Sequence, residues 1–448
     1  MRGTHQLQYN DGRWLGRAMS HAHRAQVGPM RKIVYLIDQP LDERNYDRFG
    51  IQTWLERGWT VEVWDLTPFA YQRVWENFRE SKRVLKRFSG YFPLSSRREL
   101  SDRYSKLERI EWFIDLTGDH LCSLRVRAAL ARRGALRVTS STGMIPLSQD
   151  PEHRGLLSRL RKLIAKGPVK AISLLGNVII CRLAAALTRP RLAIVSGEIS
   201  IGAAAHSRET LAVHSFDYDI YLKQLSSQDV GSRPYAVFID QDCCFHTDFL
   251  YEGGRLLTTP ERYFPAICAG LRAISRALHL DVRIAAHPRA SYQHMEHDYF
   301  QGYALECGRT AEMIKNSALV VCHDSTAIHL AVLFAKPIIF VTTDDLIPAR
   351  EGSSIAQTAA ELGKRAINLD GDLSTVDWRT EISVDAEKYS QFKRRYIKVA
   401  GTPERPMWDV VIDHIERATN SASDRSPSNV IQSAAASKGY EPPARHHQ

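Results

Sequence analysis

The sequence predicts an α/β protein built from two domains, each a parallel β-sheet covered by helices. The chain has 448 residues, enough for two or three domains of ordinary size. Its hydrophobic content of 44% and charged content of 25% are those of a globular protein. Strand patterns alternate with helical patterns along the chain, which is typical of parallel sheets whose strands are connected by helices.

The first predicted domain opens with a strand, a helix and a second strand. The apolar run 32–37 reads as a buried strand, 46–58 has helical spacing and ends at Gly58, and 60–68 is the next strand. The same unit then recurs, followed by further strands. The elements expected there are a strand over 109–118, a helix over 121–133, and strands over 136–143, 191–197 and 210–222.

The second predicted domain begins near Arg233 and shows the same alternation. Its expected elements are a strand over 235–240, a helix over 261–278, a strand over 281–288, and a strand–loop–helix–strand unit over 317–343. A helix over 405–418 is expected to cross back to the first domain. Two Rossmann-like domains that face each other across a cleft form the architecture called GT-B in glycosyltransferases.

The predicted boundaries follow from composition as well as from periodicity. Both ends of the chain lack hydrophobic periodicity, and the C-terminal end is rich in Ser, Ala and Pro. The expected division is a flexible arm over 1–29, a Rossmann-like domain over 30–230, a second over 231–400, a helix over 401–418 and a disordered tail over 419–448.

Charge and cysteine usage limit the compartment and the partners. The net charge of +10 is spread over separate segments without an RNA-binding signature, so nucleic acid is not an expected partner. The seven cysteines include no CxxC pair, which fits a reducing cytosol. The N-terminus lacks an apolar signal core, and no apolar run reaches the roughly 18–20 residues that cross a bilayer. We therefore expect a cytoplasmic protein.

The segment 155–189 spaces Arg and Lys among Leu and Ile. Basic amphipathic helices of this kind can lie on an anionic leaflet, here the inner face of the cytoplasmic membrane. Two helices that pack on the first domain and expose a basic face would give the same pattern. Both interpretations remain open.

A helix start with hydroxyl side chains follows the strand that ends at Cys322. His323, Ser325 and Thr326 precede an apolar helical run, and helix starts attract anions through unpaired N–H groups. A helix cap by Asp324 or Ser325 is expected in either case. The pattern therefore has two interpretations, a phosphate-binding loop or a helix start that is only capped.

The run IAAHPRASY ends a strand in His287, Pro288 and Arg289. Ligands of open α/β sheets bind outside the carboxyl ends of the strands, so His287 can reach the same crevice as Ser325 and Thr326. A histidine can donate to a phosphate oxygen, and an arginine offers two parallel donors to phosphate or carboxylate. The alternative is a histidine that bonds a loop carbonyl.

Acidic side chains follow the first strand of the second domain. Asp240 ends that strand and is the candidate general base, with His246 nearby as a candidate acceptor contact. Solvated turn residues are the alternative. No metal site is predicted, because Cys243 and Cys244 are too close together for ordinary zinc ligation.

Two further acids are expected on one strand. Asp217 and Asp219 lie two residues apart in the predicted strand 210–222, so their carboxylates would share a face. We expect them to be functional polar residues at the domain junction rather than ligands of a metal ion.

These segments resemble bacterial enzymes of surface-polysaccharide synthesis. The runs YAVFIDQ, FHTD, RIAAHPRASY and VVCHDSTAIHLAVLFAKPIIFVTTDD resemble the C-terminal half of such glycosyltransferases, and ERNYDRFGIQTWLERGWTVEVWDLTP resembles their N-terminal opening. The His-Pro and Ser/Thr elements are similar to those of bacterial sialyltransferases, polysialyltransferases and capsule Kdo transferases. The resemblance spans roughly residues 30–345.

The resemblance implies a GT-B enzyme that uses a CMP-activated acidic sugar. His287 would meet the CMP phosphate, and Ser325 and Thr326 would hold the phosphate or the sugar carboxylate. The family's acid lies in an Asp/Glu-Asp/Glu-Gly tripeptide, which does not occur upstream of His287 here. This departure leaves Asp240, at its strand end, as the expected base.

The sequence therefore predicts a glycosyltransferase that adds a nonulosonate or Kdo-type sugar to a capsule, lipopolysaccharide or O-antigen acceptor, with no cofactor. Its first domain would bind the glycan or lipid-linked glycan acceptor, and its second the nucleotide-sugar donor. Two other classes stay open. One is a UDP-sugar transferase or UDP-GlcNAc 2-epimerase on the same fold, and the other is a non-catalytic partner in polysaccharide assembly or export.

Overall fold

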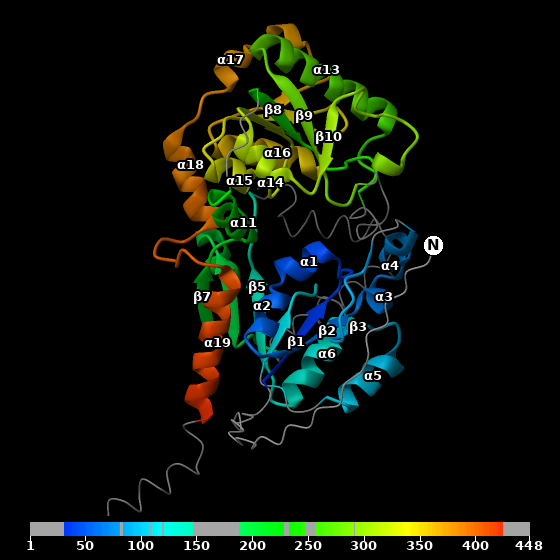
Figure 1. Cartoon of the computed structure of the whole chain (residues 1–448), viewed down its shortest axis with the longest axis vertical. Coiled ribbons are helices and arrows are strands. Elements are labelled where there is room, and N and C mark those ends of the chain that lie inside the picture. Colours follow the sequence, from blue (N-terminus) through cyan, green and yellow to red (C-terminus); the bar gives the residue numbers. More distant parts are fainter. Residues whose placement is uncertain are drawn as a thin grey trace, which may run out of the picture.

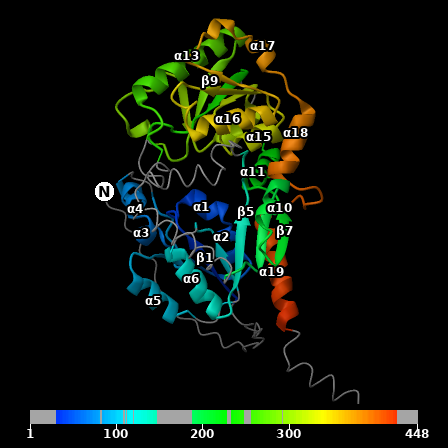
Figure 2. The same ribbon diagram turned by 180° about the vertical axis from the view of Figure 1, so that it is seen from behind.

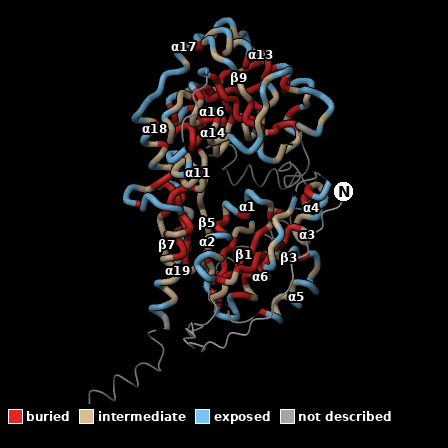
Figure 3. The backbone as a smooth tube through the Cα atoms, in the orientation of Figure 1, coloured by how far each residue is buried: buried red, intermediate tan, exposed pale blue. Residues whose placement is uncertain are grey.

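The predicted fold class is confirmed: two α/β domains lie one above the other, each around one parallel sheet (Figure 1). The computed structural model describes residues 31–80, 84–107, 110, 112–118, 121–146, 188–227, 233–246, 256–290 and 292–423. Both sheets are buried at their centres and covered by partly exposed helices (Figure 3).

The first domain is built on a seven-stranded sheet with the order β3-β2-β1-β4-β5-β6-β7, in which every pair is parallel. Its strands are β1 (Lys32–Ile37), β2 (Thr60–Asp65), β3 (Tyr91–Pro93), β4 (Trp112–Asp115), β5 (Leu136–Ser141), β6 (Leu192–Ser196) and β7 (Glu209–Val213). Apolar side chains on consecutive positions of β1 are buried, because helices cover both faces of the sheet.

The helices of this domain lie between its strands along the chain. They are α1 (Glu43–Arg48), α2 (Ile51–Glu56), α3 (Thr67–Ala70), α4 (Gln72–Glu80), α5 (Arg97–Ser105), α6 (Leu121–Arg132) and α10 (Glu198–Ala203). The single helix predicted over 46–58 is wrong, since it is broken at Gly50. That glycine has a φ of 63°, and a Cβ atom there would lie 2.2 Å from the ring of Trp408.

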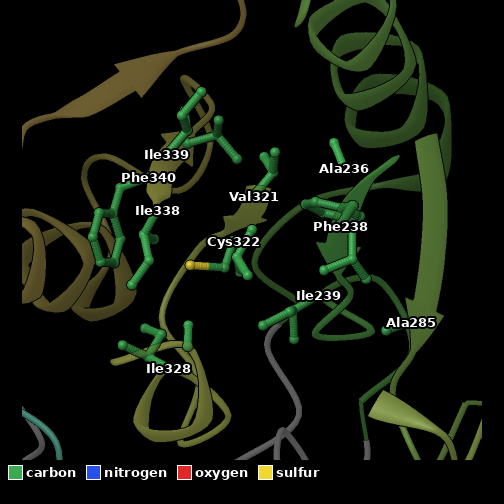
Figure 4. Close-up of a cluster of buried hydrophobic side chains, with 14 of the residues drawn as sticks. Ala236, Phe238, Ile239, Ala285, Val321, Cys322, Ile328, Ile338, Ile339 and Phe340 are labelled. Carbon is green, nitrogen blue, oxygen red and sulfur yellow. The ribbon is translucent and has the colours of Figure 1, made fainter. Parts of the chain in front are cut away.

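The second domain is built on a six-stranded parallel sheet with the order β10-β9-β8-β11-β12-β13. Its strands are β8 (Tyr235–Ile239), β9 (Asp281–Ala286), β10 (Ala304–Cys307), β11 (Leu319–Cys322), β12 (Ile338–Thr342) and β13 (Ala366–Asn368). The strands β8 and β11 lie at the centre, where Phe238, Val321 and Phe340 pack in one buried cluster (Figure 4).

Helices and short helical turns complete this domain. They are α11 (Phe216–Leu225), α13 (Pro260–Leu278), η1 (Tyr292–His294), α14 (Thr310–Asn316), α15 (Ile328–Leu333), α16 (Arg350–Glu361), η2 (Leu373–Thr375), α17 (Trp378–Glu381), α18 (Ala386–Phe392) and the π-helical turn η3 (Lys393–Ile397). α11 packs against α14 and α15, and its Tyr221 ring lies 5.0 Å from that of Phe334.

The predicted return of a C-terminal helix to the first domain is confirmed. Helix α19 (Met407–Ser423) runs along the first domain in both views (Figures 1 and 2). Its Trp408 donates to the Arg48 carbonyl oxygen at 2.8 Å, and its Glu416 accepts from Arg57 at 2.7 Å. The two chain segments that cross between domains meet in an antiparallel bridge of His214 with Lys398.

Two expectations about the chain need correction. The strand predicted over 210–222 ends at Val213, and α11 follows it after Ser215. The C-terminal helix continues to Ser423, beyond the start of the predicted tail, and there Trp112 donates to the Thr419 hydroxyl at 3.0 Å.

Several expectations lie outside the described residues. They are the flexible arm 1–29, nearly all of the basic segment 155–189 and the tail beyond Ser423. Among the helices that the structure describes, none is both long and apolar enough to cross a bilayer.

Candidate functional site

Three neighbouring strands of the second sheet end in polar residues. β9, β8 and β11 lie side by side and are followed by His287, Asp240 and His323 respectively. β8 lies between the strand that ends at His287 and the strand that precedes the Ser325 loop. All three strands are parallel, so their carboxyl ends still form one edge.

The Asp240 carboxylate joins two of these strand ends. Its Oδ1 accepts from the N–H of Asp242 at 3.1 Å, and its Oδ2 accepts from the N–H of His287 at 3.2 Å. The residue is 2% exposed. Burial raises the pKa of Asp240 to about 6, although the N–H donors oppose the shift. This geometry makes Asp240 a positioning residue for the backbone of His287.

A second carboxylate, Asp242, lies beside the first. It adopts a φ of 53° and accepts from the Tyr292 hydroxyl at 3.2 Å. Burial, together with the Asp240 charge, raises the pKa of Asp242 to about 7. An unfolded aspartate ionises near 3.8, so the folded state binds more protons between that pH and about 7. The free energy of unfolding therefore falls as pH rises through this window.

Asp242→Asn should remove this pH-dependent cost. Asparagine tolerates the left-handed conformation and can still accept from Tyr292. We expect a gain of about 1–3 kcal/mol in the free energy of unfolding at pH 8, shrinking towards zero near pH 4. Urea unfolding at both pH values measures it. A gain that is equal at pH 4 and pH 8 would contradict the ionisation account.

His287 is half-buried at the end of β9. Its Nδ1 accepts from the N–H of Arg289 at 3.3 Å, so the neutral ring carries its proton on Nε2, where it can donate. The His246 ring lies edge-on with its centroid 4.5 Å from that of His287. The structure therefore brings His287 and His246 together at the end of β9.

His323 lies instead in the core. Its ring is fully buried, with Nδ1 2.7 Å from the Val341 carbonyl oxygen and Nε2 2.7 Å from the Tyr263 hydroxyl. Burial lowers the pKa of His323 to about 4, which keeps the ring neutral. Both nitrogens thus join β11 to β12 and α13, and neither is directed at a ligand.

Ser325 and Thr326 occupy a turn rather than the first turn of a helix. α15 begins later, at Ile328, and its N-cap residue Ala327 provides no side-chain cap, so the predicted cap by Asp324 or Ser325 is wrong. The Ser325 hydroxyl accepts from the N–H of Ala327 at 3.3 Å. Both hydroxyl residues are half-buried beside Asp324, whose N–H donates to Gln241 at 3.0 Å and ties this turn to the end of β8.

The first sheet presents its own carboxyl edge to this region. Arg289 Nη2 donates to Gln39 Oε1 at 3.3 Å, and Gln39 lies just beyond the end of β1. Its neighbour Asp38 is half-buried and accepts from the N–H of Gly118 at 2.7 Å. The carboxyl ends of β1 and β9 therefore meet at the domain junction.

Asp217 and Asp219 do not act as a pair. They lie on helix α11, where residues two apart do not share a face, so the shared strand face is wrong. Asp217 Oδ2 lies 3.1 Å from Nδ1 of His329, whereas Asp219 accepts from the N–H of Met407 at 3.0 Å. His329 also contacts the Met144 carbonyl oxygen through Nε2, at 3.1 Å, and so links the two domains.

Sequence reasoning missed Asp38, Gln39 and His329. One signal was present for the first two, because β1 and β8 both end in Ile-Asp-Gln. The parallel between Asp38 and Asp240 places a carboxylate at the same position of each sheet. Nothing in the sequence around His329, inside an apolar helix, indicated a contact between domains. Among the described residues, no group of three or more His, Cys, Asp or Glu side chains could hold a metal ion.

Comparison with known proteins gives structural likeness only. No protein-family model matches the sequence, and no curated protein matches it. Similar solved structures include the S. aureus MnaA–UDP complex, with 12% identity, 87% of this chain and 97% of that chain covered, and a TM-score of 0.45. CalG4, the calicheamicin glycosyltransferase, has 13% identity, 88% and 98% coverage and a TM-score of 0.44. The wall teichoic acid polymerase TagF has 10% identity, 87% and 90% coverage and a TM-score of 0.46. Because these identities and TM-scores are low, the fold is assigned from the topology of the two sheets.

Proposed function

We propose that this protein is a glycosyltransferase of surface-polysaccharide synthesis that uses a nucleotide-sugar donor. The observation that carries the proposal is the meeting of two sheet edges. His287 and the Ser325–Thr326 turn lie on one edge, and Asp38 and Gln39 lie on the other. Ligands of α/β sheets bind at such edges. The resemblance of the motifs favours a CMP-activated nonulosonate or Kdo-type donor.

The donor phosphate would lie against the second sheet. His287 would donate from Nε2 to the phosphate oxygen that leaves the anomeric carbon, where negative charge develops as that bond breaks. The hydroxyls of Ser325 and Thr326 would donate to the remaining phosphate oxygens or to a sugar carboxylate. Arg289 was expected beside the donor, but its Nη2 donates instead to Gln39 of the first domain.

The acceptor hydroxyl would attack the anomeric carbon and lose its proton to a carboxylate. Asp240 was the expected base, but both of its oxygens accept from backbone N–H groups and it is buried. Asp38 is half-buried on the facing edge and belongs to the domain expected to bind the acceptor. We assign the base to Asp38 and a positioning role to Asp240.

The test measures nucleotide release by the full chain from CMP-N-acetylneuraminate, CMP-Kdo, UDP-GlcNAc and GDP-mannose, with and without oligosaccharide acceptors. Acceptor-dependent CMP release supports the proposal. UDP release without an acceptor would assign the chain to the epimerase class, and no release would favour a non-catalytic partner.

Asp38→Asn should abolish transfer without weakening nucleotide binding. Asp240→Asn should instead alter donor binding and rate together, through His287.

A further inference from the structure

An unusual feature of the domain junction is that arginines from both domains lie together. Arg44 and Arg48 are one helical turn apart on α1 and therefore share a face. Arg289 comes from the other domain and donates to Gln39 at 3.3 Å. The next residue along the chain, Pro40, accepts from Asn45 of α1 at 3.1 Å, so one short segment holds Arg289 beside this helix.

Arg48 is fixed in place by a ring and a glycine. Its guanidinium carbon lies 4.6 Å from the centroid of the Phe216 ring, which sets the plane of the group. A Cβ atom at Gly143 would lie 3.4 Å from Nη2 of Arg48, and Gly143 has a φ of 75°. The guanidinium therefore lies against the loop that follows β5. An ordered arginine presents its donors to a ligand with little loss of rotamer freedom.

The two arginines of α1 have no carboxylate to themselves among the described residues. Asp217 is the carboxylate that acts on both Arg44 and Arg48, and its Oδ2 already lies 3.1 Å from His329. Asp42 also acts on Arg44, but it caps α1 by accepting from the N–H of Asn45. Within the described part of the chain, neither Arg44 nor Arg48 forms an ion pair at contact distance.

The three cations affect one another. Desolvation, followed by the charges of Arg48 and Arg289, lowers the pKa of Arg44 to about 10, although part of its side chain stays exposed. The pKa of Arg48 is lowered first by burial, with Arg289 adding to the shift. On α1, Arg44 and Arg48 place two positive charges on one face, and a bound anion stabilises such a pair.

We infer that Arg44, Arg48 and Arg289 form a binding site for a phosphate or carboxylate group of the acceptor, which makes the acceptor an anionic glycan or a phosphate-linked one. This rests on the proposed function. Two of the three arginines belong to the first domain, on the side of Asp38, whereas the donor phosphate lies by His287. An acidic group held here would place a hydroxyl of the same molecule between the two edges.

The experiment is a calorimetric titration of the full chain with sodium pyrophosphate and, separately, with N-acetylneuraminic acid. Arg44→Gln and Arg48→Gln should each weaken binding of at least one probe by about tenfold or more, the loss of a charge-assisted hydrogen bond. Arg48→Lys keeps the positive charge but loses the two parallel donors of the guanidinium. Its affinity for the probe should lie between those of the parent protein and Arg48→Gln. Arg98→Gln, an exposed residue of α5, is the matched control and should bind as the parent does.

The probes separate the two sources of the anion. If the arginine substitutions weaken the binding of pyrophosphate, the acceptor is phosphate-linked. If they weaken the binding of N-acetylneuraminic acid, the acceptor is an acidic glycan. Unchanged affinities in Arg44→Gln and Arg48→Gln would overturn the site. The site would also be overturned if His287→Ala lost as much probe affinity as the arginine variants, since the arginines would then belong to the nucleotide site. If the parent protein binds a nucleotide but the arginine substitutions leave the binding of both probes unchanged, this inference alone is refuted. If the parent protein binds no nucleotide, the proposed function is refuted.

Discussion

Replacing His287 with alanine should lower the rate of sugar transfer by at least about 100-fold, the usual scale for losing one donor to a developing negative charge. The ring is held by the N–H of Arg289 on Nδ1, so its Nε2 is the donor that the substitution removes. The loss should be in kcat more than in KM, because the negative charge on the leaving oxygen grows in the transition state. Steady-state kinetics with the active donor measure both.

The controls separate chemistry from folding. His287 is half-buried at a strand end, so the alanine variant should keep the thermal midpoint of the parent within a few degrees. His206→Ala, an exposed histidine of the first domain, should leave the rate unchanged. Transfer by His287→Ala at close to the parent rate would exclude His287 from the reaction.

Trp408→Ala should cost about 3–5 kcal/mol of folding free energy, the range for truncating a buried aromatic residue. Trp408 is 4% exposed, fills the space over Gly50 and lies 6.0 Å from the ring of Tyr35. Its indole N–H donates to the carbonyl oxygen of Arg48 at 2.8 Å. The alanine variant therefore leaves a cavity between α19 and the sheet, and an unpaired carbonyl at the end of α1.

Urea unfolding of the full chain measures this cost. Trp408→Phe keeps most of the apolar contact but loses the hydrogen bond, so its cost should be about 1–2 kcal/mol. A cost below about 1 kcal/mol for Trp408→Ala would show that α19 contributes little to the first domain.

The fold followed from signals that act over short stretches of sequence. The strands over 32–37 and 235–240 are continuous apolar runs, and parallel strands buried on both faces have this pattern. The break at Gly50 was not predictable in the same way. Helical spacing continues through it, and the residue that packs against Gly50 there is Trp408, more than 350 residues away. The same holds for α11, because alternation in FDYDIYL favours a strand until its packing against α15 is known.

Only part of the candidate site could be predicted, because local sequence shows where a strand ends but not what encloses the residue after it. His287 and Asp240 each follow a buried strand, so their place at the sheet edge could be inferred from the chain alone. His323 has the same local pattern, yet Tyr263 and Val341 enclose its ring. Burial by distant elements decides whether a strand-end residue is a ligand or a core contact, and no local pattern encodes it. Arg44 and Arg48 read as an ordinary solvated helix face until Arg289 is placed beside them.

The central claim is that the edge formed by β9, β8 and β11 binds a nucleotide phosphate. Calorimetric titration with CMP, UDP and GDP, for the parent protein and for Ser325→Ala and Thr326→Ala, tests it most directly. We expect CMP to bind more tightly than UDP or GDP, and each substitution to weaken CMP binding by about 1–2 kcal/mol, the loss of a hydrogen bond to a charged group. Absence of binding by all three nucleotides, or CMP affinity unchanged in both variants, would contradict it.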